Sequence, residues 1–274
     1  DIGTVPAKGF LVVWMGSNDI KSNQAPFKLD CDGGSLFLSD QKGQLVTSIN
    51  YPEAMSRTSW ARKTDGDQEW GWTANATPGA TNATAKFATQ RLDAPEVSVG
   101  SRLFQDPFTF QVTITKGATL MYTTDGSVPT STTTTSTVRK STDGRFTVSQ
   151  KTNYVFRLFQ EGYLPSVPVT RSYIKPDNDH HYTVPVVSIV GDERYFSDPM
   201  WGIYIVGQNG IVGNGDDNIP KNWNQPWDRP VNFSYISPTE GMLFNQDVNI
   251  SISGGWTRSI DPRSVKLKSN KVFD

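Results

Sequence analysis

Four cationic side chains near the end of the sequence have the chemistry to bind phosphate: Arg258, Arg263, Lys266 and Lys268. Phosphoryl transfer requires cations that hold phosphate oxygens, together with acidic or amide side chains that hold Mg²⁺. If Val265 and Leu267 lie on a strand and face the protein core, Lys266 and Lys268 lie on the opposite face of that strand. In that position the two lysines would line a nucleotide cleft. The alternative is that all four are ordinary solvent-facing charges, and we favour this alternative for the chain as given.

Four tryptophans are candidates for stacking on glycans, because the CH faces of sugar rings are apolar and pack on exposed aromatic rings. Trp70 and Trp72 are two residues apart, which places both on one face of a strand. Trp223 and Trp227 are expected in a loop. Sandwich cores also bury tryptophan, and core packing is the interpretation that we favour for each pair.

Two other patterns resemble phosphate-binding or calcium-binding loops but lack residues that such loops require. The glycine-rich segment 207–215 lacks the Lys-Ser/Thr of a phosphate-binding loop, and we expect a mobile loop there. The acidic pairs 177/179 and 216/217 have the oxygen donors that Ca²⁺ prefers, but neither has the remaining ligands of a calcium loop. We therefore assign no metal site and no catalytic residue.

The composition argues against several classes of protein. The chain has 274 residues, with 26 Lys+Arg against 27 Asp+Glu and a net charge of −1, so it carries no basic footprint for nucleic acid. No window holds the ~18 consecutive apolar residues that predict a membrane-spanning helix. The one cysteine, Cys31, cannot form an internal disulfide or a Cys-based zinc site. Scarce cysteine fits an exported bacterial protein, so we expect an extracellular or cell-surface location with the signal segment removed.

Strands are the elements that must position these candidates. Apolar and polar residues alternate along 108–114 and 248–253, which predicts strands with one buried face. The apolar run 10–14 predicts a strand buried on both faces. Residues 192–196 predict one short helical turn, and no longer amphipathic helix is evident. The predicted fold class is mainly β.

Polar stretches near 90–95 and at 175–181 divide the chain into three segments. The predicted domains are 1–90, 93–175 and 183–274. Short strands and turn residues recur at sandwich-like spacing, which favours β-sandwiches. The family resemblances given next imply that the first two domains are immunoglobulin-like β-sandwiches and that the third is a β-rich, truncated domain.

The first segment carries short motifs at 5–14, 27–29, 34–40, 49–51, 59–62, 65–66, 70 and 77–82. Together they resemble the lamin tail domain, an immunoglobulin-like sandwich. The family's opening strands have no counterpart here. Because a half-sandwich leaves an open edge, this implies missing upstream sequence or an unusual completion.

The second segment carries a Tyr-Thr-Thr-Asp-Gly motif within 122–130, followed by 154–159, 162–166 and 172–174. These residues resemble the small β-sandwich module at the C-terminal end of chitobiase-type hexosaminidases. In that family the module is an accessory spacer and does not cleave sugar.

The third segment carries motifs at 184–190, 195–196, 202–207, 222–223, 227–231, 233–235, 248–259 and 262–268. They resemble the N-terminal part of the spore-coat protein H (CotH) kinase-like family. The resemblance implies that the metal-binding and catalytic acids lie beyond Asp274, and that Arg263 replaces a usual Lys. It makes Mg-ATP a possible cofactor of a longer parent protein, with none expected in this chain.

Two functions remain open from the sequence. The first is a non-catalytic, exported multidomain scaffold for attachment to or recognition of a polysaccharide or a surface protein, acting as a monomer. The alternative is the accessory region and first lobe of a CotH-like ATP-dependent protein kinase. We favour the first for this chain, because it holds no complete catalytic set.

Overall fold

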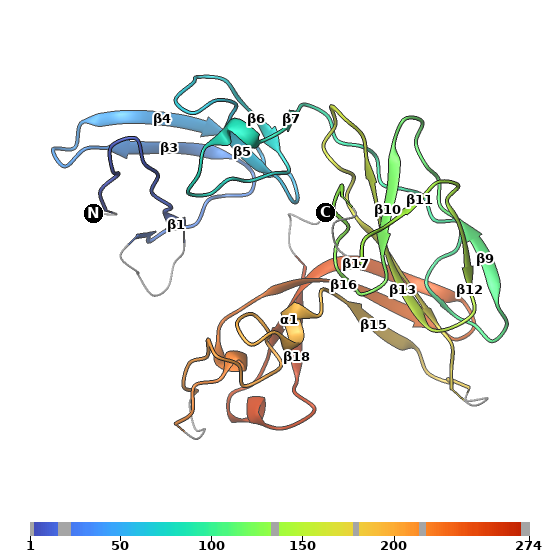
Figure 1. The fold of residues 1–274 in the computed structure, drawn as a ribbon. Coiled ribbons are helices and arrows are strands. Elements are labelled where there is room, and N and C mark those ends of the chain that lie inside the picture. Colours follow the sequence, from blue (N-terminus) through green and yellow to red (C-terminus); the bar gives the residue numbers. More distant parts are fainter. Residues whose placement is uncertain (1–2, 16–22, 133–136, 178–180, 214–217, 270–274) are drawn as a thin grey trace. The chain divides into compact units, whose positions relative to one another are not determined.

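The structure is a computed structural model that describes residues 3–15, 23–132, 137–177, 181–213 and 218–269 (Figure 1). It confirms that the fold is mainly β, with several sheets. The chain divides into two compact units: unit 1 comprises residues 1–91 and 161–165, and unit 2 comprises 92–160 and 166–274. Among the helices that the structure describes, none is long and apolar enough to cross a membrane.

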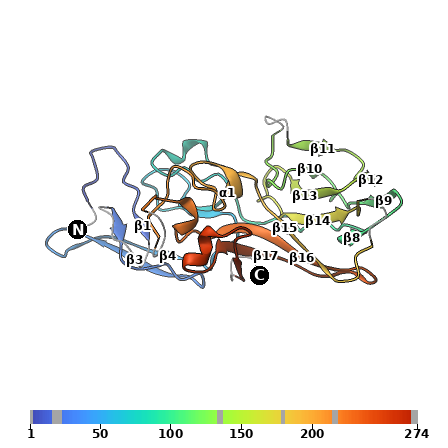
Figure 2. The ribbon, with the colours of Figure 1, turned by 90° about the horizontal axis from the view of Figure 1, so that it is seen from below.

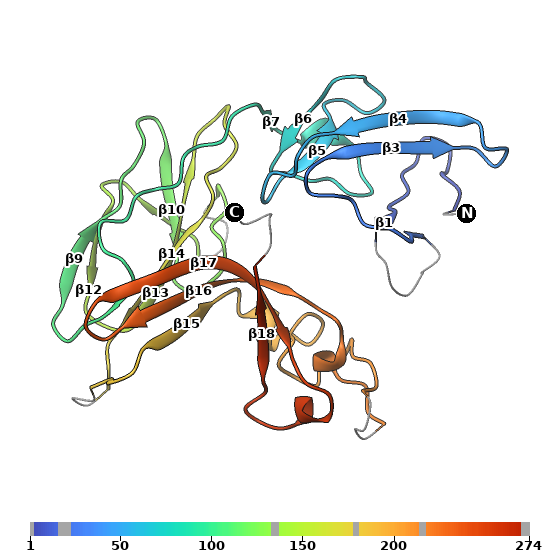
Figure 3. The ribbon, with the colours of Figure 1, turned by 180° about the vertical axis from the view of Figure 1, so that it is seen from behind.

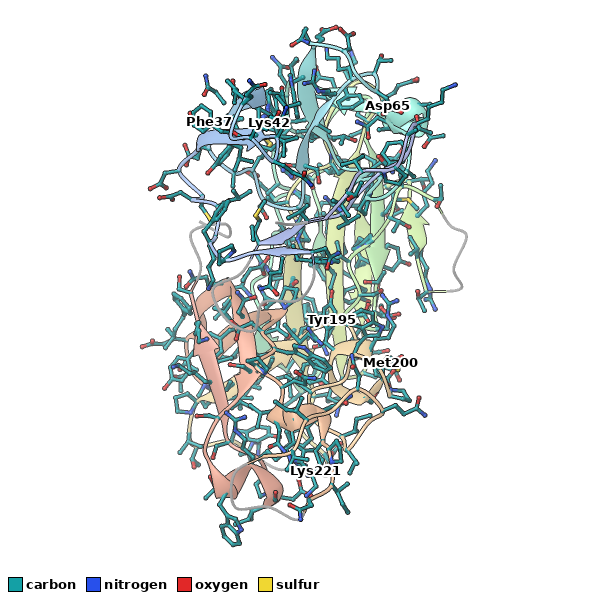
Figure 4. The ribbon with its side chains drawn as sticks, turned by 90° about the vertical axis from the view of Figure 1, so that its left-hand side faces the viewer. Phe37, Lys42, Asp65, Tyr195, Met200 and Lys221 are labelled. Carbon is teal, nitrogen blue, oxygen red and sulfur yellow. The ribbon has the colours of Figure 1, made fainter. Side chains whose placement is uncertain are left out.

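Unit 1 is built from short antiparallel pairings. β3 (Gly34–Ser39) and β4 (Leu45–Tyr51) form a hairpin, and β5 (Ser59–Arg62), β6 (Trp70–Thr73) and β7 (Phe87–Ala88) pair in that order. The hairpin turns at Lys42-Gly43, as its turn residues predict, with Asp40 Oδ1 accepting from the Lys42 amide at 2.8 Å (Figure 4). A 3₁₀ turn, η1 (Asn82–Thr84), precedes β7.

The predicted buried strand at residues 10–14 is wrong. In the described residues only β1 (Trp14–Met15) of this region is a strand, paired in parallel with β2 (Gln24–Ala25). Phe10 is 48% exposed and Trp14 is 62% exposed. An apolar run becomes a strand only where neighbouring strands accept its backbone hydrogen bonds, and residues 10–13 have no such pairing here.

The first part of unit 2 is a two-sheet sandwich. One sheet has the order β11-β10-β13-β14-β8, and β9 pairs with β12 in the other. Phe110 is 4% exposed and alternates with exposed Thr109 and Gln111, which confirms the predicted alternation. The core is aromatic and includes Phe146, Phe156 and Tyr173. The bounds are β8 Arg102–Leu103, β9 Phe108–Gln111, β10 Thr119–Thr123, β11 Arg139–Ser141, β12 Arg145–Val148, β13 Thr152–Phe159 and β14 Val169–Ile174.

The second part of unit 2 is an antiparallel sheet in the order β15-β16-β17-β18 (Figure 3). Its core gathers apolar side chains of β16 and β17 around Ile203 and Trp223. The predicted helical turn is present as α1 (Arg194–Ser197). The other bounds are β15 Val186–Val190, η2 Asn222–Asn224, β16 Arg229–Ser237, β17 Gly241–Ile252, η3 Trp256–Ser259 and β18 Val265–Lys268.

Buried serines join the two parts of unit 2 where β14 meets β15 and β16 (Figure 2). The Ser172 amide donates to Ser101 Oγ at 2.9 Å, and the hydroxyls of Ser172 and Ser188 are 2.8 Å apart. Ser101 Oγ lies 3.5 Å from Ser234 Oγ. The stretch 175–181, expected as a linker, thus falls within one compact unit, while the three domain assignments stay predictions.

Candidate functional site

Three tryptophans lie on one face of the β5-β6-β7 sheet in unit 1. The register pairs Trp60 with Trp72 and Arg62 with Trp70, so these four side chains share a face. The Trp60 and Trp72 ring centroids are 5.1 Å apart at an interplanar angle of 60°. Those of Trp60 and Trp70 are 6.5 Å apart at 16°. We call Trp60, Trp70, Trp72 and Arg62 the aromatic face.

The aromatic face is half-buried, and two of its polar atoms have no hydrogen-bond partner among the described residues. The guanidinium carbon of Arg62 lies 4.8 Å from the centre of the Trp70 ring. Trp60 Nε1 and Arg62 Nη1 are buried and have no hydrogen-bond partner among the described residues. Buried donors in native proteins are nearly always paired, but Trp223 Nε1 and Arg263 Nε also have no partner among the described residues, so the two donors support a site here only together with the gathered rings.

The turn after β5 fixes the position of this face. The side-chain Nδ2 of Asn82 donates to the Arg62 carbonyl at 2.7 Å, and the backbone N–H of Asn82 donates to Asp65 Oδ1 at 3.0 Å (Asp65 is labelled in Figure 4). Hydrogen bonds from Thr81 and the Asn82 backbone lower the pKa of Asp65. The ionised Asp65 carboxylate thus ties the Asp-Gly turn to η1 and holds the end of β5 in place.

Sequence reasoning named Trp70 and Trp72 but missed Trp60 and Arg62. The signal was available in the motif 59–62, since an antiparallel hairpin around the Asp65-Gly66 turn brings β5 opposite β6. What the sequence does not give is the register, which decides whether Trp60 faces Trp72 or the opposite side.

The other two tryptophan candidates belong to unit 2 and are packed. Trp223 is 5% exposed, with the Arg263 guanidinium carbon 3.9 Å from its ring centre and Lys221 Nζ at 5.4 Å. Trp227 is half-buried against the same core, with the Arg229 guanidinium carbon 4.6 Å from its ring centre. The burial of Trp223 and the packing of Trp227 against the core fit the core-packing interpretation, which stays a prediction.

Two of the four phosphate candidates meet at Trp223. The Arg263 side chain is 8% exposed and is ion-paired with Asp261. Arg258 donates to the Gly254 carbonyl and lies 3.5 Å from the Trp223 carbonyl oxygen. Both arginines therefore have internal partners, and they hold η2 and η3 together.

The two lysine candidates lie on the other face of β18. Leu267 packs on the core and Lys266 and Lys268 are exposed, as expected, but Val265 is also exposed, so only Leu267 of the two apolar residues faces the core. Lys268 Nζ is 3.3 Å from the Asp228 carboxylate. Lys266 has no carboxylate within salt-bridge distance among the described residues. The structure thus separates the four cations into a packed arginine pair and an exposed lysine pair.

The glycine-rich segment is packed against η2 over the part that is described. The Asn209 amide donates to Asn222 Oδ1 at 3.0 Å, and a Cβ on Gly207 would lie 2.0 Å from Asn222 Nδ2. Ile211 pairs with Lys221, which is labelled in Figure 4, in an isolated antiparallel β-bridge. The glycines therefore permit close packing against η2. Asp179 and the acidic pair 216/217 lie outside the described residues.

Comparison with known proteins adds no assignment. No protein-family model matches the chain, and no curated protein matches it. The resemblances to the lamin tail, chitobiase-type and CotH-like families therefore stay predictions from their motifs.

Proposed function

We propose that this chain is a non-catalytic, exported scaffold that attaches to or recognises a glycan through the aromatic face of unit 1. One observation carries the proposal: Trp60, Trp70 and Trp72 are gathered on one sheet face beside two donors that have no partner among the described residues. A cell-surface or extracellular location and a monomeric state belong to the same proposal.

A sugar ring suits both features of this face. Its CH face is apolar and stacks on tryptophan, and its hydroxyl and ring oxygens accept hydrogen bonds. Trp60 Nε1 and Arg62 Nη1 are covered in the unliganded chain, so a bound sugar would supply the acceptor that each lacks among the described residues only after the side chains around them move. The net gain from satisfying one such donor is about 1–3 kcal/mol, the cost of leaving it buried and unpaired.

A binding screen of the whole chain against a panel of polysaccharides tests the proposal. We expect retention by at least one polysaccharide, and loss of that retention in Trp72→Ala. Trp256→Ala is the matched control, because Trp256 is 61% exposed and lies in unit 2. Silence across the panel, or equal loss in both variants, contradicts the proposal.

A second candidate function is the first lobe of a CotH-like ATP-dependent protein kinase. It is supported by Lys266, an exposed lysine beside Lys268 without a carboxylate partner among the described residues. A longer protein that extends beyond Asp274 should then bind Mg-ATP, and Lys266→Ala should weaken that binding at least tenfold. Unchanged binding removes Lys266 from any nucleotide site.

A further inference from the structure

A cavity of about 610 Å³ lies in unit 2, in the sandwich formed by β8–β14. One wall is the segment 94–98 together with Gln111 and Thr113, and the other is formed by Val169 and Arg171 of β14. The segment is held by backbone hydrogen bonds, from the Thr113 amide to the Glu96 carbonyl and from the Ser98 amide to the Gln111 carbonyl, each 2.9 Å. The volume falls within the range of about 300–1,000 Å³ that small-molecule sites occupy.

Arg171 enters this cavity because of its place on β14. Along β14, Thr170 and Ser172 lie on the side that meets the β15-β16-β17 sheet, so Arg171 points to the other side with Tyr173, a member of the sandwich core. Arg171 is therefore a cation at the border of an aromatic core.

The charge of Arg171 has no counter-ion in the described part of the chain. Its Nη1 donates to the Thr170 carbonyl at 2.9 Å, while its Nε is buried without a hydrogen-bond partner among the described residues. Burial lowers the pKa of Arg171, and the nearby Tyr173 offsets only part of that effect. Arg263 also has a buried Nε without a partner among the described residues, but its guanidinium differs in having both a carboxylate and two aromatic rings as partners.

We infer that this cavity binds a uronic acid, with Arg171 pairing with the sugar carboxylate. A guanidinium only donates hydrogen bonds and a carboxylate such as that of Glu96 only accepts them. The ligand must therefore present an anionic acceptor toward Arg171 and hydroxyl donors toward Glu96, and a uronic acid carries both. Val97 and Val169 supply apolar walls for its CH face.

The neutral polar groups of the cavity favour a sugar over a simple anion. Gln111 Nε2 donates to the Asp143 carbonyl, which leaves its Oε1 to accept from a hydroxyl. Ser98 Oγ accepts a hydrogen bond from the Gln111 backbone N–H, and its own hydroxyl proton is left to donate. Acetate lacks hydroxyl donors for these groups, and a multiply charged anion such as phosphate would be repelled by Glu96. This site lies in unit 2 and does not depend on the aromatic face.

Calorimetric titration of the full chain with glucuronate, glucose, acetate and glycine tests the inference. We expect glucuronate to bind at least tenfold more tightly than the other three compounds. Arg171→Met, which keeps the apolar stem, should weaken glucuronate binding at least tenfold. Arg139→Met is the matched control, because Arg139 is an exposed arginine on β11, which β10 and β13 separate from β14 in the same sheet, and it should bind as the wild type does.

Each other result overturns the inference. Equal binding of acetate reduces the site to an anion site, and equal binding of glycine assigns it to amino acids. Unchanged binding by Arg171→Met, or no binding of glucuronate, removes the site. Trp72→Ala should leave glucuronate binding unchanged, so failure here is distinguishable from failure of the proposed glycan-binding face.

Thermal unfolding checks that Arg171→Met reports on binding and not on folding. A buried cation without a counter-ion contributes little to stability, and replacing it with an apolar side chain of similar length is often neutral or stabilising. We expect the unliganded variant to unfold within about 4 °C of the wild type, or higher, which corresponds to roughly 1 kcal/mol in a chain of this size. A larger decrease assigns Arg171 a structural role and overturns the inference. Val169→Phe, which fills the cavity and keeps Arg171, should also abolish glucuronate binding.

Discussion

The guanidinium carbon of Arg263 lies 3.9 Å from the centre of the Trp223 ring. The sequence makes one of these residues a candidate for phosphate and the other a candidate for sugar. In the structure each is the packing partner of the other, because the ring face that would stack on a sugar is covered by the cation that would bind phosphate. We therefore assign the proposed glycan recognition to unit 1 and not to Trp223.

Arg263→Ala should destabilise unit 2. The variant loses a cation–π contact, the apolar stem of the arginine and the ion pair with Asp261, which together contribute about 1–3 kcal/mol. Urea unfolding followed by fluorescence measures the change. Lys266→Ala is the control and should change the free energy of unfolding by no more than about 0.5 kcal/mol, because Lys266 is exposed. Equal effects of the two variants would show that the stacking contributes nothing.

Asn222→Ala should lower the stability of unit 2 by more than the small size of the asparagine side chain suggests. Asn222 is fully buried, and its Nδ2 donates to the carbonyls of Pro199 and Gly202, each at 3.0 Å. Removing the side-chain amide leaves the Gly202 carbonyl and the Asn209 backbone N–H without their partner, at about 1–3 kcal/mol for each group that water cannot reach, whereas the Pro199 carbonyl still accepts from the Gln208 backbone N–H at 2.7 Å.

Hydrogen exchange of segment 199–211 measures this effect locally. We expect faster exchange over the segment in Asn222→Ala and no change in Gln208→Ala, whose side chain is exposed. Slow exchange retained in the Asn222 variant would mean that the loop is held by other contacts.

Asp192 should make the stability of the α1 region depend on pH. Arg194 donates to both carboxylate oxygens of Asp192, with Nη2 at 2.7 Å from Oδ2, and this interaction lowers the pKa of Asp192. Because the folded-state pKa lies below the unfolded-state value of about 3.9, the contribution is complete above that value and is lost as pH falls through the folded-state pKa.

Comparison with Asp192→Asn measures this dependence. At pH 7 the wild type should be more stable by no more than about 1 kcal/mol, since the pair is partly exposed. The difference should disappear at pH values below the folded-state pKa. A difference that stays constant down to the lowest pH would assign the effect to geometry and not to charge.

Local patterns predicted the elements whose partners are close in the sequence. The alternation around Phe110 predicted β9, and the segment 192–196 predicted the helical turn α1. Both depend on interactions within a few residues or on one buried face, which a sequence displays directly.

The remaining features depend on pairings between distant segments. Arg171 lines a cavity because residues 94–98 pair with residues near Gln111, and the serines at the joint of unit 2 come from four separate strands or loops. The buried serines have no marked pattern in the sequence, and the sequence predicts a mobile loop for the glycine-rich segment 207–215 because it does not show that Asn222 packs against the described part of that segment. The run 10–14 shows the converse, since residues 10–13 pair with no strand in the described part of the chain and only Trp14 belongs to one.

The affinity of Trp60→Ala and Trp72→Ala for a polysaccharide that the wild type binds tests the central claim most directly. Affinity electrophoresis of the two variants beside the Trp256→Ala control gives that comparison in one experiment. The aromatic face predicts a loss of at least tenfold in each variant, equivalent to about 1.4 kcal/mol, with the control unchanged. Wild-type affinity in both variants would contradict the assignment of glycan recognition to this face.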